Sequence, residues 1–149
     1  MSDHFRYFFR VKFHECDPQG IVFNSRYGEY ASVAACEFMR ALKRPEGPSC
    51  VLVRQVIEWR SPARFDDVLF ARVVAQELGE SSFTLSIDFV SATSQTAIAR
   101  AASTYVLLDR KSRTSCALPT ELREALMEGA DGICVDHASH LQQAQAQAA

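Results

Sequence analysis

The sequence predicts an α+β domain in which one antiparallel sheet wraps around a long helix. Three patterns indicate it: an alternating aromatic segment near the start, a stretch with apolar residues at three- and four-residue steps, and a long strand-rich region interrupted only by short turns. Short turns favour antiparallel hairpins, because parallel neighbours need much longer crossovers. The helix must bury its apolar face, and only the sheet is large enough to cover it.

The first predicted element is a strand over residues 5–13, where apolar and basic residues alternate. Its apolar face contains Phe5, Tyr7, Phe9, Val11 and Phe13. A period of two with aromatic and β-branched residues is typical of a strand, although Phe8 departs from it. Residues 16–20 then predict a turn, because the proline fixes φ, the glycine allows a positive φ, and Asp17 can accept hydrogen bonds from its own backbone.

A helix is predicted from Ser25 to about Leu42. Its apolar face contains Tyr27, Tyr30, Ala31, Ala34, Phe38 and Ala41. This spacing puts all six side chains on one side of a helix. Asn24 and Ser25 are good N-cap residues, and the prolines and glycine of residues 45–48 are expected to end the helix. Gly28 weakens the first turn unless another group packs closely against it.

The rest of the chain completes the sheet and adds a shorter helix. The predicted strands cover residues 50–60, 67–78, 82–91 and 96–109. A second helix is predicted over 120–128, ended by Gly129. Residues 138–149 are rich in Ala and Gln, which indicates a frayed helix or a disordered segment. We therefore expect one domain over residues 1–128, followed by a partly disordered or frayed C-terminal tail over 129–149.

Composition excludes several classes of protein. The 149 residues carry a formal net charge of -2, whereas nucleic-acid-binding domains usually have a basic face. The apolar runs are too short to predict a membrane span. The N-terminal residues lack the basic and then apolar pattern of a signal peptide. We expect a cytoplasmic protein with no nucleic-acid partner.

No metal or redox cofactor is expected. The five cysteines form no C-x-x-C pair, so most should be reduced, and neither a disulfide framework nor a zinc ribbon is predicted. His137 and His140 have a spacing that fits either a solvated tail or an adventitious metal site, with no third ligand nearby in the sequence. Motifs for dinucleotide binding, the P-loop and the nucleophile elbow are absent from the sequence.

The most informative segment is Asp17 and the residues that lead from it to the start of the helix. Unpaired backbone N–H groups and the positive end of the helix dipole lie there, and they can stabilise a developing oxyanion. A carboxylate nearby could act as nucleophile or general base on the same carbonyl. These physical features leave two interpretations open: a catalytic Asp17, or a turn residue that only binds its own backbone.

The motif Asp-Pro-Gln-Gly-Ile-Val-Phe over residues 17–23, followed by Tyr27, closely resembles the active-site motif of the 4-hydroxybenzoyl-CoA thioesterase family. These proteins are acyl-CoA thioesterases of hot-dog fold. The resemblance extends over about residues 5–127. Supporting segments are residues 59–69, 79–83, 105–109 and 119–122.

The resemblance implies a hot-dog fold, in which the antiparallel sheet wraps around a long central helix, and hydrolysis of an acyl-CoA thioester. Asp17 would attack the thioester carbon or activate water, and the backbone N–H of Asn24, with Ser25 as its neighbour, would polarise the carbonyl. The remaining matching residues would contact substrate: Gly20, Ile21, Val22, Phe23 and Tyr27. CoA is part of the substrate, and no other cofactor is implied. The family also implies a homodimer or dimer of dimers with the site between subunits.

The sequence departs from the family pattern at two places. Asn24 stands where the family has an aromatic residue, and residues 78–81 lack the basic side chains expected before the Ser-Phe pair. The basic cluster of Arg110, Lys111 and Arg113 could hold the CoA phosphates instead, or it could be a solvated turn. Glu29 and Glu37 on the helix rank second as catalytic carboxylates. The motifs of hot-dog dehydratases are not found here. The alternative function is a non-catalytic acyl-CoA-binding or interaction domain.

Overall fold

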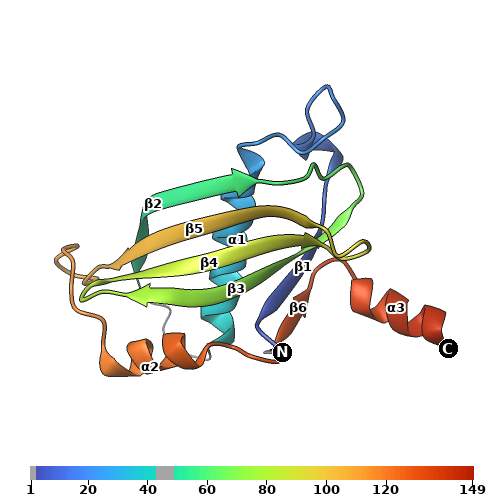
Figure 1. Cartoon of the computed structure of the whole chain (residues 1–149). Coiled ribbons are helices and arrows are strands. Elements are labelled where there is room, and N and C mark those ends of the chain that lie inside the picture. Colours follow the sequence, from blue (N-terminus) through green and yellow to red (C-terminus); the bar gives the residue numbers. More distant parts are fainter. Residues whose placement is uncertain (1–2, 43–48) are drawn as a thin grey trace.

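The computed structural model describes residues 3–42 and 49–149 (Figure 1). These residues form, in chain order, β1 (Arg6–Arg10), the short 3-10 helix η1 (Phe13–Glu15), α1 (Arg26–Ala41), β2 (Cys50–Trp59), β3 (Val68–Leu78), β4 (Ser82–Ser91), β5 (Ala97–Leu107), α2 (Thr120–Glu128), β6 (Cys134–Asp136) and α3 (His140–Ala148). Residues 45–48, which were predicted to end the helix, lie outside the described part of the chain.

The strands form one six-stranded sheet in the order β2-β5-β4-β3-β1-β6. Every pair from β2 to β1 is antiparallel, as the short turns predict. Only β6 differs, because it runs parallel to β1. The α+β class is confirmed, and the prediction of a wholly antiparallel sheet was wrong at this one edge.

Helix α1 lies behind the sheet (Figure 1). Ser25 and Leu42 cap it, and its buried apolar side chains join one apolar cluster with residues of β1, β3, β4 and β5. Gly28 is explained by close packing, since a Cβ atom there would meet Gln55 Oε1 of β2 at 3.1 Å. Gln55 in turn donates a hydrogen bond of 3.0 Å to Ser103 Oγ, which is fully buried on β5.

The first strand is shorter than the alternation predicts. β1 ends at Arg10, and residues 13–15 turn into η1, which leaves Phe13 78% exposed instead of buried on the core face. The turn forms because the Glu15 side chain accepts a hydrogen bond of 2.7 Å from the Lys12 N–H. Alternation alone carries no information about such a side-chain cap.

The C-terminal tail contains a short strand and a helix. Residues 134–136 form β6, which was not predicted because three residues are too few to show a period, and α3 follows. The tail covers Phe8, the residue that breaks the alternation of the first strand. Phe8 is 3% exposed in a second apolar cluster with Phe70, against which Leu141 of α3 packs.

Truncating the centre of the main cluster should destabilise the domain strongly. Phe38 of α1 is fully buried and meets the Phe5 ring edge-on, with ring centroids 5.7 Å apart. We expect Phe38→Ala to lower the free energy of unfolding by about 3–5 kcal/mol, because it removes apolar contacts and leaves a cavity. Val33→Ala, at an exposed position of the same helix, should change it by less than about 1 kcal/mol. Urea unfolding of both variants measures the difference, and equal losses would contradict this account of the core.

Candidate active site

Asp17 lies in a small hairpin over residues 16–22, here called the Asp17 hairpin. Cys16 and Val22 form an antiparallel bridge, the Asp17 N–H donates to Ile21 O at 2.8 Å, and Gly20 closes the turn with φ of 79°. Asp17 Oδ1 accepts from the N–H groups of Gln19 at 2.8 Å and Ile21 at 3.4 Å. Its other oxygen has no hydrogen-bond partner within residues 3–42 and 49–149, so the carboxylate keeps one oxygen for another group.

The start of α1 presents backbone N–H groups beside this carboxylate. The N–H groups of Arg26, Tyr27 and Gly28 already donate to carbonyls three residues earlier, at 2.9, 3.4 and 3.2 Å. Ser25 is the N-cap, but its side chain makes no capping hydrogen bond. Among the described residues, nothing accepts from the backbone N–H of Asn24 or of Ser25. These two donors therefore remain available at the positive end of the helix dipole.

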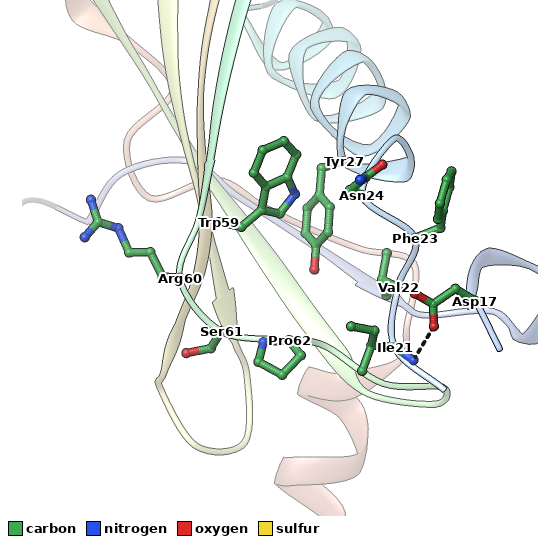
Figure 2. Close-up of a pocket in the computed structure, with 10 residues that line it drawn as sticks. All are labelled: Asp17, Ile21, Val22, Phe23, Asn24, Tyr27, Trp59, Arg60, Ser61 and Pro62. Carbon is green, nitrogen blue, oxygen red and sulfur yellow. Dashed lines mark hydrogen bonds between the residues drawn. The ribbon is translucent and has the colours of Figure 1, made fainter. Parts of the chain in front are cut away.

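Asp17 and Asn24 line the same cavity, which has a volume of about 440 Å³. Figure 2 shows Asp17 and Asn24 on one side, Trp59 on the other, and Tyr27 between them. The complete lining is Asp17, Ile21, Val22, Phe23, Asn24, Tyr27, Trp59, Arg60, Ser61 and Pro62. Burial raises the pKa of Tyr27 to about 12, so its hydroxyl stays protonated at neutral pH. The cavity thus combines one carboxylate with a mainly apolar wall.

Trp59 and residues 60–62 are the pocket residues that motif reasoning did not assign. The Trp59 side chain is 54% exposed at the end of β2. The segment after it reaches the Asp17 hairpin through a bridge between Ile21 and Arg64 and through a hydrogen bond of 2.8 Å from Val22 N–H to Ala63 O. Only the resemblance over residues 59–69 pointed to this segment. The Arg60 side chain points away from Asp17 (Figure 2).

Other predicted residues lie outside the cavity. Gly20 sits at the exposed tip of the hairpin and Ser25 is exposed beside the lining. Glu29 is exposed and pairs with Arg26 at 3.0 Å, while the buried Glu37 pairs with Arg40 at 2.6 Å. Neither glutamate lines this cavity, which favours Asp17 as the reacting carboxylate.

The basic turn, defined as Arg110, Lys111, Ser112 and Arg113, lies at the opposite end of the sheet from Asp17. It follows the end of β5, where Leu107 pairs with Cys50, whereas the cavity lies at the Trp59 end of β2, which pairs with Ala99. Eight residues of strand separate these ends, which is about 26 Å at roughly 3.3 Å per residue. Within one chain, the basic turn is therefore far from the Asp17 carboxylate.

Asp109 keeps the basic turn in a defined shape. Its Oδ1 accepts from the N–H groups of Lys111 at 3.0 Å and Ser112 at 2.8 Å, and from the Ser112 hydroxyl at 3.0 Å. The hydrogen bonds from Ser112 hold the pKa of the Asp109 carboxyl below its usual value. The turn is thus organised before any ligand binds.

The histidines at the tail have packing partners. His137 meets the Tyr7 ring edge-on, and His140 stacks on Phe8. All five cysteines are free thiols. Over the described ranges, no group of three or more His, Cys, Asp or Glu side chains is placed to hold a metal ion. None of the described helices is long and apolar enough to cross a membrane.

Comparison with known proteins finds similar proteins of one family. The model of the thioesterase-like superfamily matches residues 11–126. A candidate esterase of Aquifex aeolicus (strain VF5) is 31% identical over 125 residues, which cover 80% of this chain and 94% of that protein. The solved structure of a gentisyl-coenzyme A thioesterase is 28% identical with a TM-score of 0.72, covering 80% of this chain and 98% of that one.

A 4-hydroxybenzoyl-CoA thioesterase variant bound to 4-hydroxybenzoyl-CoA has the same fold, with a TM-score of 0.72 at 18% identity over 84% of this chain and 99% of that one. The family match spans the Asp17 hairpin, α1 and the strands that line the cavity. The chain therefore belongs to the thioesterase-like superfamily and is an acyl-CoA thioester hydrolase of hot-dog fold.

Proposed function

We propose that this enzyme hydrolyses acyl-CoA thioesters with Asp17 as the reacting carboxylate and the Asn24 N–H as the oxyanion donor. The observation that carries the proposal is that two residues line one cavity: Asp17, which has an unpaired carboxylate oxygen, and Asn24, which has an unpaired backbone N–H at the start of α1. Such a donor stabilises the charge that develops on the carbonyl oxygen during attack. Ser25 contributes the neighbouring N–H, and Gly20 lets the hairpin turn tightly next to the substrate.

Two routes fit this placement, and both give free acid and CoA. In the first, the Asp17 carboxylate forms a bond to the thioester carbon and the carbon–sulfur bond breaks, so that CoA leaves as a thiolate and takes a proton from solvent. Water then cleaves the resulting anhydride. In the second, Asp17 takes a proton from a water molecule whose oxygen forms a bond to the thioester carbon. The carbon–sulfur bond then breaks, and CoA leaves as a thiolate that takes a proton. In both, the apolar side chains of Ile21, Val22 and Phe23 line the cavity beside the reacting carboxylate.

We infer that the working unit is a homodimer or a dimer of dimers. β2 is an edge strand of ten residues and pairs only with β5 among the described strands. Its exposed apolar side chains are Val51, Leu52, Val53, Val56 and Trp59. A long, apolar, unpaired edge tends to associate with another strand. The Asp17 cavity lies at the end of this edge, where a second subunit would deepen it.

A dimer would also explain the basic turn. If two copies join their β2 edges in antiparallel fashion about a two-fold axis, the Cys50 end of one strand lies beside the Trp59 end of the other. The basic turn of the partner subunit then comes to the end of the sheet that holds Asp17. We propose that Arg110, Lys111 and Arg113 contact the CoA phosphates from the partner subunit.

Trp59 should contribute to substrate binding. We expect Trp59→Ala to raise KM about tenfold, because it removes an apolar contact worth roughly 1.4 kcal/mol. It should change kcat less, because the indole takes no part in the proposed bond-breaking steps. Steady-state kinetics with one acyl-CoA measure both constants. Met127→Ala, on an exposed part of α2, is the control with unchanged KM. An unchanged KM in Trp59→Ala would remove this residue from the binding site.

A substrate panel tests the proposed function directly. The purified protein is assayed for CoA release from acetyl-, medium-chain acyl-, palmitoyl-, benzoyl-, phenylacetyl- and gentisyl-CoA. Gentisyl-CoA is included because one similar solved structure is named a gentisyl-coenzyme A thioesterase. Hydrolysis of at least one ester is expected. Tight binding of an acyl-CoA without turnover would instead support a non-catalytic acyl-CoA-binding domain.

A further inference from the structure

Glu15 is a buried carboxylate that the proposed chemistry does not use. It is 8% exposed and lies two residues before Asp17. None of the ion pairs recorded between described residues includes it. Burying a carboxylate without a positive partner is unfavourable unless hydrogen bonds replace the lost water. Its hydrogen bonds therefore indicate the structural role of this side chain.

Those hydrogen bonds join the Asp17 hairpin to α1. Glu15 Oε1 accepts from the Tyr30 hydroxyl at 3.0 Å and from the Lys12 N–H at 2.7 Å. The Glu15 carbonyl accepts from the N–H of Phe23 at 2.9 Å. Glu15 and Phe23 are the residues that flank the hairpin, so one residue ties its two ends together and fastens them to the helix.

Tyr30, which donates the hydrogen bond to Glu15, is itself held in place by packing. It is 6% exposed, and its ring packs against Phe9, Tyr27 and Phe89 at centroid distances of 4.6, 5.6 and 6.3 Å. Burial and the neighbouring Glu15 charge raise the pKa of Tyr30, so the hydroxyl remains a donor. The carboxylate of Asp17, by contrast, accepts hydrogen bonds from N–H groups of its own hairpin and from no other part of residues 3–42 and 49–149. Its distance from the Asn24 N–H is therefore set by what holds the hairpin.

We propose that the buried hydrogen bond between Glu15 and Tyr30 positions Asp17 against the start of α1, which makes both residues positioning residues for thioester hydrolysis. The proposal rests on the assigned role of Asp17. A displacement of about 1 Å between reacting groups lowers rates by about a hundredfold. The link thus acts mainly on kcat, whereas the part of the cavity wall formed by Trp59 and residues 60–62, which lies outside the hairpin, stays in place.

Kinetics of matched variants test this role. Tyr30→Phe removes only the hydroxyl and is expected to lower kcat about 10- to 100-fold with KM changed less than about twofold. Glu15→Ala should have the same effect. Glu15→Gln keeps the accepting oxygen and should restore kcat to within about threefold of the wild type. Tyr105→Phe removes a hydroxyl at the other end of the sheet, where Tyr105 stacks on Phe83, and should leave both constants unchanged.

Hydrogen exchange gives a readout that needs no substrate. In Tyr30→Phe, backbone exchange in residues 14–23 should be at least about threefold faster, while β3 to β5 stay protected. Three results would each overturn the positioning role. They are a wild-type kcat in Tyr30→Phe, unchanged backbone exchange in residues 14–23, and a loss of activity that matches the unfolded fraction measured by circular dichroism. Full activity in Asp17→Asn, or no hydrolysis by the wild type, would overturn the proposed function instead, so the two failures are distinguishable.

Discussion

Replacing Asp17 by Asn is expected to lower kcat by about a thousandfold, the scale of a positioned acid–base or nucleophilic group. The amide keeps the size of the side chain, and its oxygen can still accept from Gln19 and Ile21. The hairpin should therefore keep its shape, while the group that attacks carbon or activates water is lost. KM should change little, because the cavity wall is untouched.

Asp66→Asn is the matched control for this substitution. Asp66 is exposed, lies outside the Asp17 cavity and has a φ of 72°, which Asn tolerates well. It should retain wild-type kinetics. If Asp17→Asn kept full kcat while both variants remained folded, the carboxylate would be only a turn residue, and the catalytic group would have to be sought among the other polar groups of the cavity.

Mixed dimers of two impaired variants should be more active than either variant alone. One chain carries Asp17→Asn, and the other carries Ala at Arg110, Lys111 and Arg113. The triple variant alone should lose about 100-fold in kcat/KM, the effect of roughly two charge-assisted hydrogen bonds. In a mixed dimer, one site combines an intact Asp17 from one subunit with an intact basic turn from the other.

Co-expression of the two chains should give about a quarter of the wild-type activity at low substrate, because half of the randomly paired dimers are mixed and each contains one complete site. Activity no greater than the sum of the two variants would show that the basic turn does not act across the interface. A triple variant with wild-type kcat/KM would show that the turn is solvated and binds no phosphate.

Local patterns predicted most of the fold. The apolar spacing of residues 25–42 and the short turns between strands predicted a helix and antiparallel neighbours, because both patterns follow directly from local geometry. Phe13 was placed wrongly, since the Glu15 side chain ends the strand early through a contact that alternation does not encode. β6 was missed, because its three residues acquire their structure from pairing with β1 and not from their own sequence.

The candidate site was predictable in part. The motif over residues 17–23 located the carboxylate and the start of the helix, since they are neighbours in sequence. Trp59 and the link between Glu15 and Tyr30 depend on tertiary contacts, so motif reasoning did not assign them a role. The basic turn illustrates the converse limit. Its charge left open either a phosphate site or a solvated turn, and only the strand register shows that it lies far from Asp17 in the same chain.

A crystal structure with a non-hydrolysable acyl-CoA analogue tests the central claim most directly. The account predicts an Asp17 carboxylate oxygen about 3–3.5 Å from the carbon of the bound carbonyl group. It also predicts the carbonyl oxygen about 2.7–3.1 Å from the Asn24 nitrogen, with the CoA phosphates on the basic turn of a partner subunit. A carbonyl bound elsewhere, with neither Asp17 nor the Asn24 N–H within reach, would contradict it.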